Sequence, residues 1–138
     1  MSILKVSYQH SNDDDFGRLR LIVETPDFAG SGGFWVQWQD VEEFAETLKT
    51  YPLSADAPPA AKWGFNTCEG DDLIIELEVK PIDRRGTLRV SVEIADDFEP
   101  KRRLRTIFNT HYPQMEEFHD ALVRVMRREA EEAVLTGE

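Results

Sequence analysis

The chain has 138 residues, of which 41% are hydrophobic, which suits one folded domain and argues against global disorder. The formal net charge of −11 disfavours nucleic-acid binding, because phosphate backbones would be repelled. We expect a cytoplasmic protein that binds no membrane. No apolar run approaches the ~20 residues that span a bilayer, the N-terminus has no signal-peptide pattern, and the one cysteine, Cys68, cannot form an intrachain disulfide.

The first third of the chain predicts three strands. Apolar and polar residues alternate over residues 4–9 and again over residues 18–24, and an Asn/Asp/Gly-rich turn lies between them, which is typical of a hairpin. The glycine-rich segment at residues 30–33 reads as the next hairpin loop. A third strand follows, in which Phe34, Val36 and Trp38 share one face and Trp35 points the other way.

A helix is expected over about residues 40–50. Its apolar residues recur at helical spacing, Asp40 is a good N-cap residue with Glu43 three positions later, and Pro52 ends the helix. The Pro/Ala-rich segment at residues 54–61 is predicted to be a surface loop. The residues that carry the helical pattern are Val41, Phe44, Ala45 and Leu48.

The next segment predicts a second group of strands. Trp63 and Phe65 mark a short strand, and clear alternation follows at residues 73–80 and 88–94, with a shorter strand at residues 104–108. Turns at residues 83–86 and 96–100 separate the last three, which indicates an antiparallel meander.

The last predicted element is a helix over residues 113–134. Pro113 suits a first helical turn, and an apolar stripe runs along one side, formed by Met115, Phe118, Leu122, Val125 and Met126. The tail after about residue 135 is expected to fray. The order βββα-ββββα therefore predicts a single α+β domain over residues 1–138, mostly antiparallel sheet packed with two helices.

No residue pattern points to chemistry, and we expect no catalytic, cofactor-binding or metal-binding residues. His111 and His119 are eight positions apart, whereas two ligands on one helix face need a spacing of three or four. The acidic pairs fall in predicted turns, where Asp is common for backbone reasons. Cys68 lies beside Glu69 and Asp71, whose charges oppose thiolate formation.

Trp35, Arg103 and Arg105 are the candidate interaction residues. Trp35 points away from Phe34 and Val36, so it is an interface anchor if that face is open and a core residue if a helix covers it. Arg103 and Arg105 share one face of a predicted strand and would suit an acidic partner. The favoured alternative is that these arginines pair across strands with the glutamates at positions 76, 78 and 93.

The chain resembles small uncharacterised bacterial domains that include the immunity proteins of wall-associated-protein toxin systems (WapI-like). The resemblance covers most of the chain as a pattern. It rests on residues 33–36 leading into residues 41–48, on the alternating strands at residues 73–79 and 86–94, and on the closing helix at residues 115–126. It implies a cytoplasmic, non-enzymatic protein that binds and neutralises a partner, and it carries over no catalytic residue.

Three functional hypotheses follow. The first is a non-enzymatic protein-binding domain, of immunity type, whose acidic surface attracts a basic protein partner, because opposite charges speed association. The second is a small-ligand or enzymatic domain on the open sheet face, with polar groups from His10, His111 or the arginines at 103 and 105. The third is a structural domain that forms a homo-oligomer through an exposed apolar strand or helix face.

Overall fold

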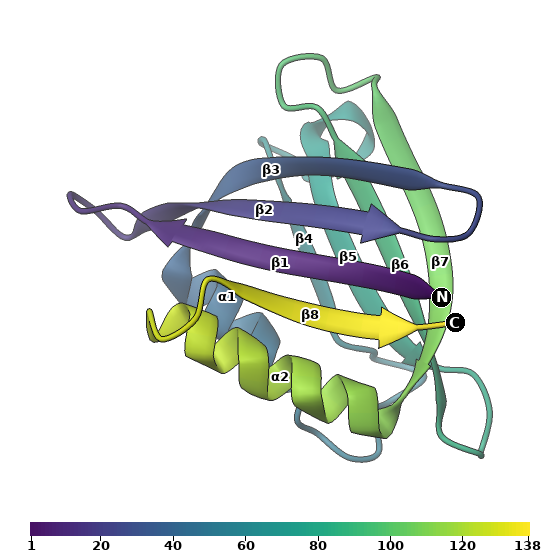
Figure 1. Ribbon diagram of the computed structural model, residues 1–138. Coiled ribbons are helices and arrows are strands. Elements are labelled where there is room, and N and C mark those ends of the chain that lie inside the picture. The colour runs from purple at the N-terminus through teal and green to yellow at the C-terminus, as the bar shows by residue number, and fades with distance from the viewer.

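The chain forms two antiparallel sheets, which lie face to face in the computed structural model of residues 1–138 (Figure 1). The first sheet has the order β3-β2-β1-β8 and the second has the order β4-β5-β6-β7. The strands are β1 (Ser2–His10), β2 (Phe16–Glu24), β3 (Ala29–Gln37), β4 (Ala60–Gly64), β5 (Leu73–Pro81), β6 (Thr87–Ala95), β7 (Arg103–His111) and β8 (Glu132–Gly137). The helices are α1 (Trp38–Thr47) and α2 (Tyr112–Met126), with a single 3-10 turn at Gly70–Asp72.

The predicted α+β class and the order of its elements are confirmed. The β1–β2 hairpin and the β5–β6–β7 meander form as the alternation indicated, with residues such as Leu4 and Leu21 buried on the inner face. The alternation of apolar and polar residues predicts these strands correctly, because each strand has one face on the core and one in water.

The prediction that residues 30–33 form a loop is wrong. These residues lie inside β3, paired with β2 from Ala29 to Gln37, and the tight turn falls earlier, at Thr25–Phe28. Close packing explains the glycines. A Cβ on Gly30 would lie 2.6 Å from the Leu104 side chain, and one on Gly32 would lie 2.5 Å from Ile94. Leu104 and Ile94 thus occupy the space that side chains at positions 30 and 32 would need.

The first helix starts two residues before its predicted position. Trp38 is the first residue of α1 rather than the last of a strand, and Gln37 is the N-cap, without a side-chain cap hydrogen bond. Asp40 is therefore not the N-cap. The Trp38 N–H donates instead to the backbone oxygen of Asp15 (2.9 Å), so the β1–β2 turn holds the helix start. The helix ends at Thr47, before Pro52.

The C-terminal prediction needs a larger correction. The helix ends at Met126 rather than residue 134, and Arg128 turns the chain with a φ of 63°, in the left-handed region. Strand β8 takes the place of the last residues of the predicted helix and the start of the predicted frayed tail, and it pairs with β1 from Ser2↔Gly137 to Ser7↔Glu132. Ala and Glu favour a helix locally, but the pairing with β1 buries Ala133 and Leu135 completely, and this burial decides the outcome.

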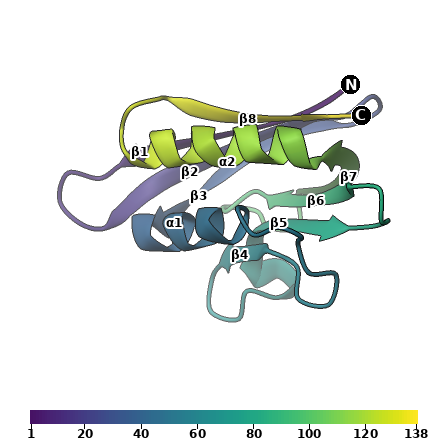
Figure 2. The same ribbon diagram turned by 90° about the horizontal axis from the view of Figure 1, so that it is seen from below.

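Helix α2 lies along the β8 side of the molecule, and α1, which follows β3 directly in the chain, lies beside α2 (Figures 1 and 2). The apolar side of α2 packs against β8 and β1, and α1 packs beside α2. Together with the inner faces of the two sheets they enclose one core of 30 buried residues. The inner sheet faces are thus filled by side chains, whereas the far side, along β3, has no helix over it.

Candidate functional site

Trp35 lies on the outer face of the first sheet, and 53% of its surface is exposed. No helix covers it, which answers the question that the sequence left open. Phe16 is its diagonal neighbour across the β2–β3 ladder, where Phe16 pairs with Gln37 and Trp35 pairs with Arg18. Phe16 is also exposed, at 42%. Two large aromatic side chains therefore lie together in water at the corner of this sheet.

These two residues line an aromatic hollow of about 660 Å³ between β3 and β4. We use this name for the hollow lined by the aromatic side chains Phe16, Phe34, Trp35, Trp63 and Phe65. Phe34 and Phe65 meet edge to face with ring centroids 5.3 Å apart, and Phe65 is 44% exposed. Asp40 and Asp97 line the same hollow, together with Cys68 and Lys62. The lining is therefore mostly apolar, with two carboxylates and one lysine among it.

The β4–β5 connection holds Phe65 in place. The ladder shifts register at Trp63/Gly64, where a Cβ on Gly64 would collide with the backbone of Asp72. The Phe65 N–H donates to the Asp72 oxygen (2.8 Å), and the Asp72 carboxylate accepts from the Thr67 hydroxyl (2.9 Å). A bulge and two hydrogen bonds thus present Phe65 to the hollow.

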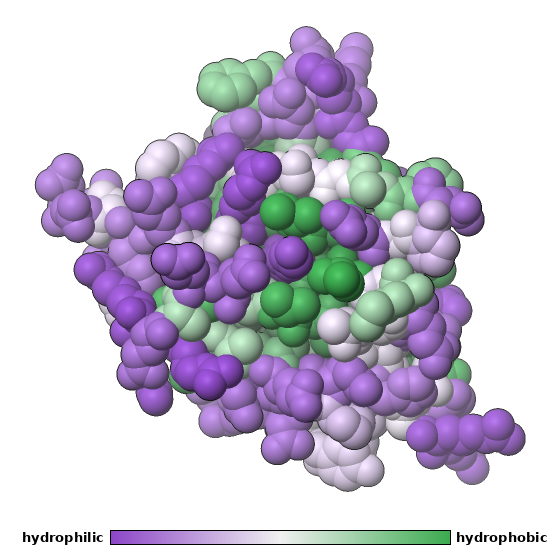
Figure 3. All heavy atoms as spheres, in the orientation of Figure 1, coloured by the Kyte–Doolittle hydropathy of each residue, from purple (hydrophilic) through white to green (hydrophobic).

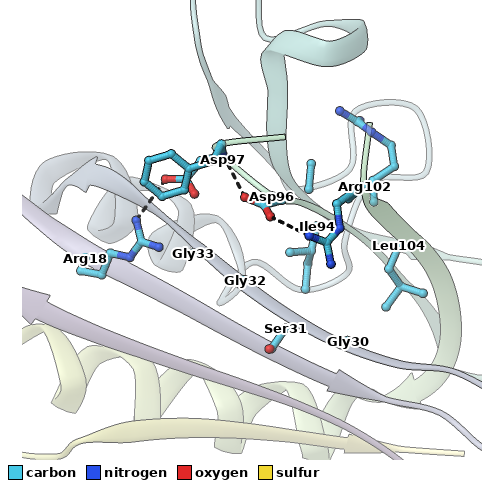
Figure 4. Close-up of a pocket in the computed structure, with 13 residues that line it drawn as sticks. Arg18, Gly30, Ser31, Gly32, Gly33, Ile94, Asp96, Asp97, Arg102 and Leu104 are labelled. Carbon is cyan, nitrogen blue, oxygen red and sulfur yellow. Dashed lines mark hydrogen bonds and ion pairs between the residues drawn. The ribbon is translucent and has the colours of Figure 1, made fainter. Parts of the chain in front are cut away.

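A second hollow, of about 450 Å³, continues along β3 beside its glycines (Figure 4). We call it the glycine hollow. It is lined by residues 30–33 of β3 and by the β6–β7 turn, where Asp96 pairs with Arg102 at 3.8 Å. Its lining is mostly polar or backbone, in contrast to that of the aromatic hollow.

The Arg18–Asp97 ion pair divides the two hollows. Arg18 starts on β2, lies over Gly33 and reaches Asp97 of the β6–β7 turn at 3.4 Å (Figure 4). A Cβ on Gly33 would come within 3.2 Å of the Arg18 Nε, so the absent side chain makes room for the arginine. The pair crosses the edge of β3 and links the two sheets. Since both side chains are partly exposed, its contribution to stability is small.

Arg103 and Arg105 bind the same glutamate rather than forming a free basic patch. Arg103 Nη1 lies 2.6 Å from Glu93 Oε2, and its other nitrogens donate to the backbone oxygens of Leu73 and Pro100. Arg105 Nε lies 3.3 Å from the other Glu93 oxygen and leaves its side chain 79% exposed. The cross-strand pairing that the sequence favoured is therefore found at Glu93. Arg103 lines the glycine hollow, so the structure does not place the arginines beside Trp35.

The histidines do not gather at one place. His10 packs edge to face against Tyr8, and burial together with the nearby Arg128 lowers the pKa of His10. His119 is mostly buried next to α1, with Nδ1 3.0 Å from Asp120. No group of three or more His, Cys, Asp or Glu side chains is arranged to hold a metal ion.

Tyr8 has a structural role that the sequence did not reveal. Burial, reinforced by the charges of Asp14 and Asp40, raises its pKa to about 12, so the hydroxyl keeps its proton at neutral pH. It donates to the Val36 backbone oxygen at 2.7 Å and occupies the space that a side chain on Gly17 would need. This contact fixes the part of β3 that presents Trp35.

A second exposed apolar area lies in the middle of the outer face of the first sheet (Figure 3). The register places Ile22 of β2 and Val134 of β8 on either side of Lys5, and Ile3 follows on the same face. Polar side chains surround this area, and a lysine at its centre interrupts it.

Sequence reasoning identified Trp35 but missed Phe16, Phe65 and the Arg18–Asp97 ion pair as its neighbours. Phe16 did carry a signal, since it is a large apolar residue next to an acidic turn. Arg18 and Asp97 are 79 positions apart in sequence and carried none.

Comparisons with known proteins add no relative. No protein-family model matches the chain, and neither a curated protein nor a solved structure matches it. Neither of the two helices combines the length and the apolar character needed to cross a bilayer.

Proposed function

We propose that this chain is a non-enzymatic bacterial protein-binding domain of immunity type, which neutralises a basic protein partner in the cytoplasm. The observation that carries the proposal is the aromatic hollow, with Trp35, Phe16 and Phe65 half exposed at its mouth. Exposed Trp and aromatic neighbours in a concave surface are typical of binding hot spots, because a partner side chain can be fully desolvated there. The resemblance to WapI-like immunity proteins supports the same class.

The charge around the hollow supports a basic partner. Asp40 and Asp97 line it against one basic residue, Lys62. Two acidic segments adjoin its lining residues in sequence: residues 13–15 before Phe16 and residues 69–72 after Cys68. Residues 1–80, which supply most of the lining, hold 15 acidic and only 6 basic side chains. A positive partner would be steered to this corner, and the association rate would fall as salt rises.

The packing of the sheets bears on the small-ligand alternative. That hypothesis placed polar groups on the open, concave face of a sheet, and side chains of the core fill the faces that the two sheets turn toward each other. The hollows described above open at the β3 side of the molecule, where aromatic rings outnumber titratable groups in the larger one. A wide, open surface of this kind suits a protein better than an enclosed small molecule.

The test is retention of a partner from a lysate of the source organism on the immobilised protein, followed by reconstitution with the purified candidate. The site variant is Trp35→Ala/Phe65→Ala, and the matched control is Ile107→Ala, because Ile107 is 51% exposed on the outer face of the other sheet. We expect a basic protein that forms a 1:1 complex with wild type and with the control. The site variant should bind it ~30-fold more weakly, the effect of losing one aromatic hot spot.

Equal affinity of the site variant and the Ile107 variant would overturn the proposal, as would a partner that is acidic or whose binding does not weaken with salt.

A further inference from the structure

We propose that the partner binds by strand addition: an extended, basic segment pairs with the free edge of β3 and becomes a fifth strand of the first sheet. This inference rests on the proposed function, because it assumes a basic protein partner at the same corner of the molecule. It adds the mode of recognition and the residues that provide it.

β3 is an edge strand, since the order of the sheet places only β2 beside it. Thr25 and Phe28 bond to each other in both directions at one end of the ladder, and the Trp38 N–H reaches the Asp15 oxygen at the other. Antiparallel ladders alternate between bonded and non-bonded pairs. The residues that bond to β2 are therefore Gly30, Gly32, Phe34 and Val36. The backbone groups of Ala29, Ser31, Gly33, Trp35 and Gln37 point away from the sheet.

This edge lacks the features that usually protect a free strand. Its nine residues include no charged residue and no proline, and positions 30–33 hold three glycines and one serine. Proteins commonly shield free edges with lysines, prolines, bulges or very short strands. The other sheet shows such devices, because β4 has five residues with Lys62 and a register shift, and β7 carries Arg103 and Arg105.

Open space runs along the same edge. The glycine hollow lies beside residues 30–33 and the aromatic hollow beside residues 34–37, so both halves of β3 adjoin a hollow. Only the Arg18–Asp97 ion pair crosses between them, over Gly33. A lysine or arginine of an incoming segment can take the place of Arg18 on Asp97. The ion pair is then exchanged rather than lost, and the full edge becomes available.

Charge selects a basic segment over a second copy of this chain. Two copies paired through β3 would each bring a net charge of −11 to the interface. The charged side chains that line the two hollows nearly cancel: Arg18, Lys62, Arg102 and Arg103 against Asp40, Asp96 and Asp97. The net charge of the whole chain therefore decides between the occupants. Like charges at an interface oppose association, whereas a lysine-rich segment meets complementary charge. Backbone pairing then supplies the affinity, and alternate side chains reach the two hollows.

The probe is a nine-residue peptide, as long as β3, in which lysine and valine alternate. A second peptide has the same sequence with N-methyl groups on the backbone amides of alternate residues, which removes the donors for strand pairing and keeps the charge. Affinity is measured by fluorescence anisotropy in about 50 mM salt, where surface charges are weakly screened, and the amide signals of Ser31, Gly33 and Trp35 are followed by NMR.

The protein variants are Ser31→Pro and Ser31→Ala. The Ser31 N–H points away from β2, so proline removes an edge donor without breaking the ladder, a position at which strands accept proline. Alanine removes the hydroxyl but keeps the N–H. We expect wild type and Ser31→Ala to bind the lysine peptide alike, and Ser31→Pro to bind at least ~10-fold more weakly, because a backbone hydrogen bond is lost. The N-methylated peptide, which does not depend on the folding of any variant, should show the same loss with wild type.

Equal binding of the two peptides, together with unchanged affinity of Ser31→Pro, would overturn strand addition and leave the proposed function standing as side-chain recognition. Absence of saturable binding to wild type would also overturn it, while the proposed function keeps its own test with the captured partner. A wild-type protein that is dimeric when Ser31→Pro is monomeric would show a second copy on this edge and contradict the basic occupant.

Discussion

The two edges of the first sheet differ in their contacts with the rest of the molecule. At the β8 edge, the Thr110 hydroxyl donates to the Thr136 oxygen (2.7 Å) and the Glu138 N–H donates to the Asn109 oxygen (2.9 Å), so β8 is bonded to β7 of the other sheet. Helix α2 also packs against β8. At the β3 edge the polar contact with the other sheet is a single ion pair, between Arg18 and Asp97.

This difference separates an edge that the fold closes from an edge that it leaves open. Burying a strand edge requires partners for its backbone groups, and β7 supplies two of them on the β8 side, for the Thr136 oxygen and the Glu138 N–H. On the β3 side these groups remain in water next to exposed aromatic side chains. The three predictions below concern stability and test how much each edge contributes to the fold.

The largest expected effect is at the closed edge. Leu135→Ala removes a side chain of β8 that is 1% exposed, and we expect the free energy of unfolding to fall by about 2–5 kcal/mol, the usual cost of such a cavity. Urea denaturation followed by circular dichroism measures it. The matched control is Val134→Ala on the outer face of the same strand, which should change stability by less than about 1 kcal/mol. Equal effects of the two substitutions would mean that β8 does not contribute a buried face.

A smaller loss is expected from filling the glycine contact in β3. Gly32→Val places a Cβ 2.5 Å from the Ile94 side chain and should cost about 1–3 kcal/mol through overpacking. Ser31→Val, one position away on the exposed face, should be nearly neutral. Combining Gly32→Val with Ile94→Ala should show a favourable coupling energy in a double-mutant cycle. Strict additivity would contradict the proposed contact between the sheets.

The link between β7 and β8 should have the smallest effect of the three. Thr110→Val keeps the shape but removes the hydroxyl that donates to the Thr136 oxygen, at a cost of about 1 kcal/mol. Hydrogen exchange should show faster opening of β8 amides with little change in β2. Thr136→Val keeps the acceptor oxygen and serves as the control. A Thr110 variant with unchanged exchange in β8 would mean that the helix and the Glu138–Asn109 hydrogen bond suffice to close this edge.

Local pattern was sufficient for the strands whose two faces have different surroundings. Residues 73–80 and 88–94 alternate strongly because one face enters the core and the other enters water, and turns rich in Asp and Gly fix the register between them. The apolar stripe of α2 was equally clear, and Met115, Phe118 and Leu122 are buried as expected. The orientation of Trp35 followed from the same alternation.

Strands β3 and β8 could not be predicted from local pattern. Residues 30–33 resemble a loop because a glycine carries no polarity pattern, and only the closeness of Leu104 and Ile94 explains their place in β3. Residues 129–134 favour a helix by composition, and only the vacant edge of β1 makes a strand the better choice.

The chain's own pattern therefore specified the α+β class, most strands, the apolar side of each helix and the acidic character of the surface, because these depend on neighbours a few residues apart. Tertiary contacts decided which edge is closed, which is free, and which side chains accompany Trp35. Phe65, Arg18 and Asp97 reach the β3 edge from three separate elements. Such contacts depend on how the two sheets pack, which short-range periodicity does not encode.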